Sequence, residues 1–270
     1  MNWIESLIYG LVSGFAEFLP VSSSAHQLLL EKLFGVEGSS NLQNLLVHLA
    51  ALAVLCYSCR ALLQEMNNRP VAVRSGRRTV RKPPDIRLVQ TAAIPLLLGF
   101  LLYPTVNGWV RDMVLPTVFL IVNGVILFVP SRMMSGNKDA RGMSGFDSIL
   151  IGIGGILAVC PGISRVGSML SVASARGADK QHALNWTLLL CVPALIVLIG
   201  FDVFSIISGG GAASGTGILG YIFSTVGAAV GGYFGIMLMR FLAVKAGFSG
   251  FAYYSWGAAL FSFILYLTVL

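Results

Sequence analysis

The strongest constraint on the fold of this chain is a series of apolar stretches that are long enough to cross a lipid bilayer. A membrane-spanning helix needs about 20 apolar residues, and six stretches reach or approach that length: about 42–59, 88–106, 115–130, 186–206, 217–239 and 249–269. Only 11% of the residues are charged, against about 25% in a soluble domain. A soluble globule cannot hide so much apolar surface, and a disordered chain would be rich in charge. The sequence therefore predicts an all-α polytopic membrane protein.

Two further apolar stretches, 3–34 and 148–175, are too long for one span, and each is interrupted near its centre. The first contains the segment Leu19-Pro20-Val21-Ser22-Ser23-Ser24, and the second contains Pro161-Gly162-Ile163-Ser164-Arg165. Irregular backbone is tolerated at membrane depth only where protein or a wet cavity surrounds it. We therefore expect each stretch to form a re-entrant helix–loop–helix pair.

The distribution of positive charge predicts the orientation in the membrane. If the two interrupted stretches are re-entrant, fifteen of the 18 lysines and arginines fall on one side, eight of them in the loop 60–87. The positive-inside rule places this side in the cytoplasm and both chain ends outside. The basic loop could bind nucleic acid, but an orientation signal that contacts anionic membrane lipids is the favoured interpretation. We expect no nucleic-acid partner.

The two interrupted segments also resemble each other. The glycine-containing segment 10–14 precedes Pro20 much as the segment 151–155 precedes Pro161, and a P-x-x-S pattern starts at both prolines, 141 residues apart. One pair is expected to enter the membrane from outside and the other from inside. The combination predicts an inverted-topology repeat.

On this interpretation the whole chain, 1–270, is one integral membrane domain with a first repeat at about 1–130 and a second at about 148–270. Inverted repeats place their binding site at the repeat interface, where broken helices meet. Helix N-termini there present free N–H groups and the positive end of the helix dipole, which favours an anionic ligand.

The two breaks contain side chains that suit phosphate chemistry. The first offers Glu17, Ser22, Ser23, Ser24 and His26, and the second offers Ser164, Arg165 and Ser168. A charge near the bilayer centre costs at least ~2.5–3.5 kcal/mol, so Glu17 and Arg165 are expected to be functional and to need partners. An arginine binds phosphate oxygens through two parallel hydrogen bonds. A serine hydroxyl attacks phosphorus when a base takes its proton, and a carboxylate can hold magnesium together with substrate phosphates.

The Glu17–Arg165 pair and a further histidine each have a simpler interpretation. A buried Glu17–Arg165 ion pair could merely lock the repeats together, but such a pair would not need three consecutive serines and a histidine beside it. His48 is a second, weaker candidate site residue within its own span. For a lone histidine in a helix, packing is the more common role.

The string Gly14-Phe15-Ala16-Glu17-Phe18-Leu19-Pro20-Val21-Ser22-Ser23-Ser24-Ala25-His26 resembles the first signature of the undecaprenyl-pyrophosphate phosphatases of the bacitracin-resistance (BacA) type, and Pro161-Gly162-Ile163-Ser164-Arg165 resembles their second. Weaker similarity covers nearly the whole chain. The resemblance implies a phosphatase of the bacterial plasma membrane, with inverted repeats and an active site that opens to the outer face. It implies removal of one phosphate from undecaprenyl pyrophosphate, which regenerates the carrier lipid for cell-wall synthesis, with Mg²⁺ or Ca²⁺ as the divalent cofactor.

The same resemblance assigns roles to individual residues. Ser23 matches the proposed nucleophile, His26 the nearby acid/base group, Glu17 a metal-binding or general-base carboxylate, and Arg165 the pyrophosphate-binding arginine. We add four serines, Ser22, Ser24, Ser164 and Ser168, as further candidates for substrate binding. The expected partner is a prenyl pyrophosphate lipid, and formation of a homodimer is left open.

The chain departs from the family pattern around the expected site. Ser13 stands where the family usually has a second glutamate, and Val166 and Met169 replace a serine and a threonine. Gly155 stands for a glutamine, and Ser255 stands for an arginine. The leading hypothesis is a divergent prenyl-pyrophosphate phosphatase. The alternatives are a non-catalytic prenyl-phosphate transporter or flippase of the same fold, and a structural or regulatory membrane subunit.

Overall fold

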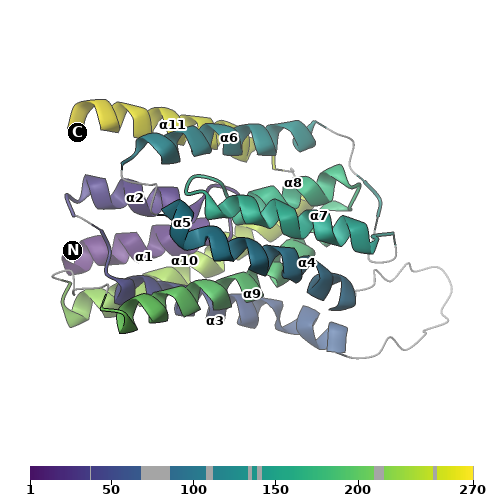
Figure 1. Cartoon of the computed structure of the whole chain (residues 1–270), viewed down its shortest axis with the longest axis horizontal. Helices are drawn as coiled ribbons and strands as arrows, with labels where there is room; N and C mark the ends of the chain where they lie inside the picture. Colours follow the sequence, from purple (N-terminus) through teal and green to yellow (C-terminus); the bar gives the residue numbers. More distant parts are fainter. Residues whose placement is uncertain are drawn as a thin grey trace.

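The computed structural model describes residues 1–36, 38–67, 86–107, 112–132, 136–138, 142–209, 216–245 and 248–269. Apart from a single β-bridge between Lys138 and Ala178, the regular structure of these residues is helical, as predicted. Figure 1 shows the helices stacked roughly parallel to the long axis of the molecule. In chain order the helices are α1 (Trp3–Glu17), α2 (Ser23–Leu33), α3 (Asn41–Asn67), α4 (Ile86–Gly99), η1 (Phe100–Leu102), α5 (Tyr103–Asn107), α6 (Val114–Ser131), α7 (Gly145–Ile156), η2 (Leu157–Val159), α8 (Arg165–Ala175), α9 (Lys180–Ile207), α10 (Ile218–Lys245) and α11 (Gly250–Val269).

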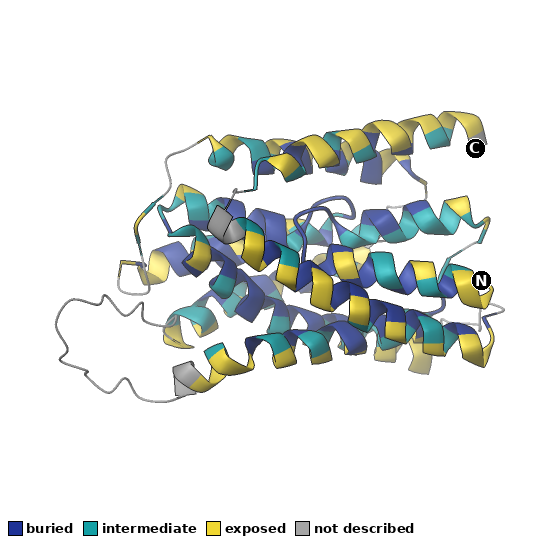
Figure 2. Ribbon diagram, turned by 180° about the vertical axis from the view of Figure 1, so that it is seen from behind, coloured by how far each residue is buried: buried dark blue, intermediate teal, exposed yellow. Residues whose placement is uncertain are grey.

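Six helical stretches in these residues are long and apolar enough to cross a membrane, and they coincide with the six predicted spans. They are Asn41–Gln64, Ile86–Val106, Val114–Ser131, Lys180–Ile207, Ile218–Leu242 and Gly250–Thr268. Large apolar side chains point outward from them, and Leu101 and Ile207 are 70% and 79% exposed. Figure 2 shows buried residues on the inward helix faces and exposed residues on the outer ones. This pattern suits a lipid environment, and the chain is a multi-pass membrane protein by its helix composition.

Three helix ends differ from the prediction by six residues or more, and one of them is the end of α10, which continues to Lys245 although the predicted span ends at 239. Helix α9 begins at Lys180, six residues before the predicted span, because Asp179 caps it and accepts a hydrogen bond from the N–H of His182. Helix α3 continues to Asn67, so the first part of the predicted basic loop is helical. The rest of that loop, 68–85, lies outside the described residues.

Both interrupted stretches break at the predicted places. The first consists of α1, which ends at Glu17, and α2, which begins at Ser23. The second consists of α7, the 3₁₀ turn η2, and α8, which begins at Arg165 after Ser164 caps it by accepting a hydrogen bond from the N–H of Gly167. The two helices of each pair contact each other. In Figure 1 both breaks lie toward the middle of the molecule, and the pairs extend from them toward opposite ends.

Direct hydrogen bonds join the two breaks. The N–H of Gly162 donates to Ser22 Oγ at 3.1 Å, and Ser164 Oγ donates to the carbonyl oxygen of Leu19 at 3.0 Å. Ser22 has a φ of 64°, in the left-handed region that residues other than glycine rarely adopt. Such backbone strain persists only where surrounding contacts hold it, and it concentrates at functional sites.

Helix α6 ties the breaks together from the side through the fully buried Asn123. Its Oδ1 accepts a hydrogen bond from the N–H of Ser164 at 2.9 Å. Its Nδ2 donates to the carbonyl oxygen of Pro20 at 3.1 Å and to Ser255 Oγ at 3.0 Å. A buried backbone group left without a partner costs about 1–3 kcal/mol. This one side chain therefore stabilises both breaks.

An ion pair joins the ends of α7 and α8 that lie farthest from the second break. Asp147, in the first turn of α7, pairs with Arg176 at the C-terminal end of α8 and lies 3.6 Å from Lys138 Nζ. Asp147 also accepts a hydrogen bond from the N–H of Ser144, which caps α7. The ion pair therefore helps to hold together the two helices on either side of the second break.

Glycines allow α1 and α10 to approach each other closely. A Cβ added at Gly10 would lie 2.0 Å from the carbonyl oxygen of Ser224, and one added at Gly14 would lie 2.1 Å from that of Ala228. Small residues spaced four apart permit this kind of backbone contact between membrane helices. The contact fixes the position of α1, whose last residue is Glu17.

We expect Gly10→Ala to lower the free energy of unfolding by about 1–3 kcal/mol, the usual cost of forcing extra volume into a packed interface. Thermal unfolding in detergent measures the effect. Gly257→Ala on α11 is the matched control, because no atom lies within 4 Å of a Cβ added there. Equal unfolding temperatures for the two variants would contradict the proposed tightness of the α1–α10 contact.

Candidate active site

A cavity of about 320 Å³ lies where the two breaks meet. It is lined by residues from both breaks, from α2, α3 and α9, and from the η1–α5 segment. Residues far apart in the chain therefore share one cavity. The polar lining residues are Glu17, Ser22, Ser23, Ser24, Gln27, Glu31, Ser39, Asn44, His48, Tyr103, Ser164, Arg165 and Asp202. The structure thus brings together six of the eight predicted site residues, and His26 and Ser168 are not among the lining residues.

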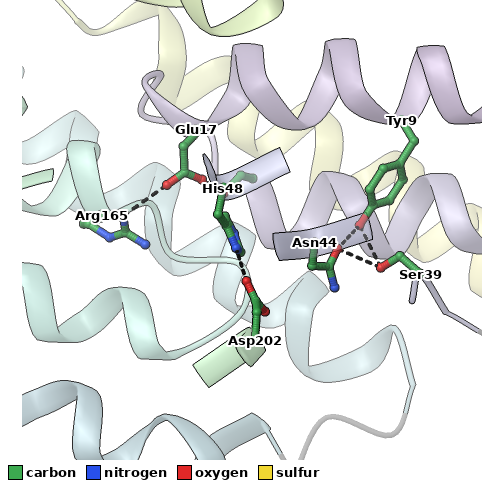
Figure 3. A network of polar contacts seen from close by, with 8 residues as sticks. Tyr9, Glu17, Ser39, Asn44, His48, Arg165 and Asp202 are labelled. Atoms are coloured by element: carbon green, nitrogen blue, oxygen red, sulfur yellow. Dashed lines mark hydrogen bonds and ion pairs between the residues drawn. The ribbon is translucent and has the colours of Figure 1, made fainter. Parts of the chain in front are cut away.

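Glu17 is the central residue of this cavity. One carboxylate oxygen accepts a hydrogen bond from Ser23 Oγ at 2.6 Å, and the other accepts one from Arg165 Nη1 at 3.0 Å. The Glu17 and Arg165 side chains are only 7% and 11% exposed. Figure 3 shows the two side chains directed at each other. The three residues stand at the C-terminal end of α1 and the first positions of α2 and α8, so the breaks themselves bring them into contact.

The arrangement is that of a serine hydroxyl held by a base. A hydroxyl becomes a nucleophile when an adjacent acceptor takes its proton, and Glu17 Oε2 is placed to do so. Helix α2 begins at Ser23 without a side-chain cap. Its first N–H groups are therefore available to an anion beside the hydroxyl.

Arg165 has a hydrogen-bond donor that no described residue accepts from. Its Nε is buried and has no partner among the described residues. The guanidinium carbon lies 5.4 Å from the centre of the Phe100 ring, and both residues line the cavity. A flat guanidinium with unused donors fits the two-point binding of a phosphate group.

His26 follows Ser23 by three residues on α2, but its ring forms hydrogen bonds with other groups. Its Nδ1 is 2.8 Å from the carbonyl oxygen of Ser22, and its Nε2 is 2.7 Å from the hydroxyl of Tyr254, whose ring stacks on it. These bonds turn the imidazole toward α11, and Glu17 is the group bonded to Ser23. The acid/base role of His26 stays a prediction.

The four candidate serines differ in their surroundings. Ser22 and Ser164 line the cavity, but their hydroxyls already join the two breaks. Ser24 also lines it and lies 3.2 Å from Ser22, Oγ to Oγ. Ser168 is fully buried in α8, and its hydroxyl has no partner in the described part of the chain. Ser24 is therefore the added serine with the best access to a ligand.

Sequence reasoning missed Asp202, which lies on α9 and faces His48 of α3. The distance from His48 Nδ1 to Asp202 Oδ2 is 2.7 Å. One signal could have found it, because an acidic residue within the apolar stretch 186–206 is uncommon and calls for a partner. The weaker candidate His48 is thus part of the cavity wall, with a partner.

The five residues that depart from the family pattern, Val166 among them, lie outside the lining of the cavity. Ser255 bonds to Asn123 behind the site, and Ser13 is buried on α1 and is not a lining residue. Gly155 and Met169 are neighbours, since a Cβ at position 155 would lie 3.2 Å from the Met169 sulfur. Methionine therefore fills space that a side chain at position 155 would take.

The donor set limits how a divalent metal could be held. Among the described residues no cluster of three or more His, Cys, Asp or Glu side chains could hold a metal ion. Both Glu17 oxygens already have partners. Magnesium characteristically uses one or two carboxylates together with substrate phosphates. An ion at this site would therefore need substrate phosphates among its ligands, and Glu17 could serve as its carboxylate only after one oxygen gives up its present partner.

Comparison with known proteins agrees with these features. Residues 6–261 match the family described as bacitracin resistance protein BacA. The undecaprenyl-diphosphatase of Carboxydothermus hydrogenoformans is 31% identical over 257 residues, covering 95% of this chain and 94% of that protein. The undecaprenyl-diphosphatase of Methanobrevibacter smithii is 31% identical and covers 95% of each chain. Undecaprenyl-diphosphatase 1 of Shouchella clausii is 32% identical and covers 98% of this chain and 96% of that protein. With its Ser23–Glu17–Arg165 cavity between two helix breaks, this chain belongs to the BacA family.

Proposed function

We propose that this chain hydrolyses undecaprenyl pyrophosphate to undecaprenyl phosphate and inorganic phosphate. Full-length relatives at about 30% identity that carry the name undecaprenyl-diphosphatase support the activity. The observation that carries it is the buried carboxylate of Glu17, which accepts a hydrogen bond from the hydroxyl of Ser23 and another from Arg165. An ion pair that only stabilised the fold would not explain the contact of Glu17 with Ser23 or the polar cavity around them.

Substrate binding changes the partners of Arg165. Its guanidinium binds oxygens of the pyrophosphate, helped by the free N–H groups at the start of α2. Glu17 then retains Ser23 as its partner. A divalent ion bound to Glu17 and the substrate phosphates would neutralise phosphate charge and orient the group that is transferred.

The reaction proceeds in two steps. Ser23 Oγ attacks the terminal phosphorus while its proton moves to Glu17 Oε2. The bond from that phosphorus to the bridging oxygen breaks, and the prenyl phosphate leaves. Water then hydrolyses the phosphoserine, and inorganic phosphate is released.

A phosphate-release assay tests the proposal. The purified protein is mixed with undecaprenyl pyrophosphate, with and without Mg²⁺ or Ca²⁺, and inorganic phosphate is measured. We expect metal-stimulated release. No release with any metal would overturn the enzyme assignment, and movement of a prenyl phosphate across vesicles without hydrolysis would favour the transporter alternative.

We also propose that the pairs α1–α2 and α7–α8 are re-entrant and belong to inverted repeats, with the site open to the outer face of the plasma membrane. The extension of the pairs toward opposite ends of the molecule supports this arrangement. The split of positive charge supports an outer location for both chain ends. The repeat boundaries near 130 and 148 stay predictions, and homodimer formation stays open.

Cysteine labelling tests this orientation. In a variant without the four native cysteines, we expect Ser75→Cys to react with a membrane-impermeant maleimide only after the cells are opened, because the positive-inside rule places this position in the cytoplasm. Asn2→Cys, near the N-terminus, is the control and should react in intact cells. Labelling of position 75 from outside would reject the orientation.

A further inference from the structure

A second polar pair lines the cavity, and the two steps above do not use it. His48 on α3 and Asp202 on α9 face each other at 2.7 Å, with 13% and 15% of their side chains exposed. Both residues share the cavity wall with Ser23 and Glu17. Figure 3 shows this pair in the same part of the protein as the Glu17–Arg165 pair. A charged residue within a membrane span is expensive and functional by default.

The bond between the two side chains determines where the imidazole can accept a proton. An ionised carboxylate only accepts hydrogen bonds, so the contact assigns the donated proton to His48 Nδ1. In the neutral ring this leaves the lone pair on Nε2. A histidine held in this way can take a proton at Nε2, and the carboxylate then stabilises the imidazolium that forms.

The proposed reaction leaves a specific need for such a group. After Ser23 attacks, Glu17 holds the serine proton and can no longer accept one from water. The position one helical turn before Glu17, where the family usually has a second glutamate, is Ser13 in this chain. The second step therefore needs a base other than these two residues, and His48 is the histidine among the described residues that line the cavity.

We propose that His48, oriented by Asp202, is the base that activates water for hydrolysis of the Ser23 phosphoester. The water oxygen bonds to phosphorus while one water proton moves to His48 Nε2. The bond between phosphorus and Ser23 Oγ breaks, Oγ takes back the proton from Glu17, and inorganic phosphate leaves. The imidazolium then returns its proton to bulk water. The inference rests on the proposed phosphatase function.

His48→Gln tests this role, because glutamine can still donate to Asp202 but cannot take a proton. We expect kcat to fall by about 100-fold or more, the usual size of a general-base contribution. KM should fall with it, because the slow second step traps the enzyme as phosphoserine, and kcat/KM should change little. Because the first step is intact, the phosphoserine should accumulate toward one per chain. Acid quenching followed by intact mass measurement detects the added phosphate.

Asp202→Asn tests the positioning role of the carboxylate. We expect kcat and KM to fall together and phosphoserine to accumulate, because an asparagine amide can donate to Nδ1 and leave the imidazole proton on Nε2. His182→Gln is the matched control. His182 is also a buried histidine, on α9, but it is not among the residues that line the cavity. It should show the turnover of the wild type and no accumulation.

The outcomes separate this inference from the proposed function. A wild type that releases phosphate, together with a folded His48→Gln variant of normal turnover, rejects the role of His48 alone. Loss of activity in that variant without phosphoserine also rejects it, because His48 would then act before the second step. If His48→Gln does not fold, Asp202→Asn decides by the same measurement. A wild type that releases no phosphate rejects the proposed function itself.

Discussion

Replacing Arg165 by lysine is expected to reduce phosphate release by at least about 100-fold. The Arg165 fork holds Glu17 with Nη1, and its Nε is buried without a partner among the described residues. Lysine keeps the charge that Glu17 needs, so the fold should survive. It cannot reproduce two parallel hydrogen bonds to a phosphate. Loss of one donor that stabilises transition-state charge costs about 10²–10³-fold in rate.

The measurement is kcat and KM for phosphate release, with thermal unfolding of each variant in detergent. Arg176→Lys is the matched control, because Arg176 lies at the other end of α8 and pairs with Asp147 away from the cavity. We expect it to retain the turnover of the wild type. Arg165→Ala is less informative, since it leaves the buried Glu17 carboxylate without its charge partner, at a cost of about 3–5 kcal/mol. Near-normal turnover of Arg165→Lys would reject two-point phosphate binding.

Glu17→Gln should lower metal-stimulated hydrolysis by at least about 100-fold, since it removes the proposed base and the proposed metal carboxylate together. The amide oxygen can still accept a hydrogen bond from Ser23 or Arg165, so the cavity should keep its shape. The amide cannot take the serine proton. Unlike His48→Gln, this variant should not accumulate phosphoserine, because the first step is the one that fails.

The experiment is a magnesium titration of phosphate release by the wild type and the variant, after both are shown to fold. Glu31→Gln is the control. Glu31 lines the same cavity but accepts a hydrogen bond from the N–H of Ser39 and has no assigned role in the reaction. It should retain turnover within a few-fold of the wild type. Strong metal-dependent release that is unchanged in Glu17→Gln would refute the assignment of Glu17.

The sequence by itself determined the spans and the two breaks, and it singled out Glu17, Ser23 and Arg165 as candidate site residues, which the structure brings into contact. Transfer of a helix into lipid depends on local composition, so six spans could be found without knowing their neighbours. Pro95, Pro130 and Pro193 lie inside continuous helices, so it is the combination of a proline with consecutive polar residues that marks the two breaks. The cost of charge at membrane depth singled out Glu17 and Arg165, and their pairing followed from the need of each for a partner.

Only the tertiary structure decided which groups share the cavity. His48 and Asp202 are 154 residues apart and lie on two separate helices, so their contact depends on how α3 packs against α9. His26 is three residues from Ser23, yet the ring is turned away because Ser22 and Tyr254 offer it hydrogen bonds. Hydropathy and residue spacing predict the secondary structure and membrane location of one segment. The direction of a side chain and the identity of its partner depend on the packing of several segments at once.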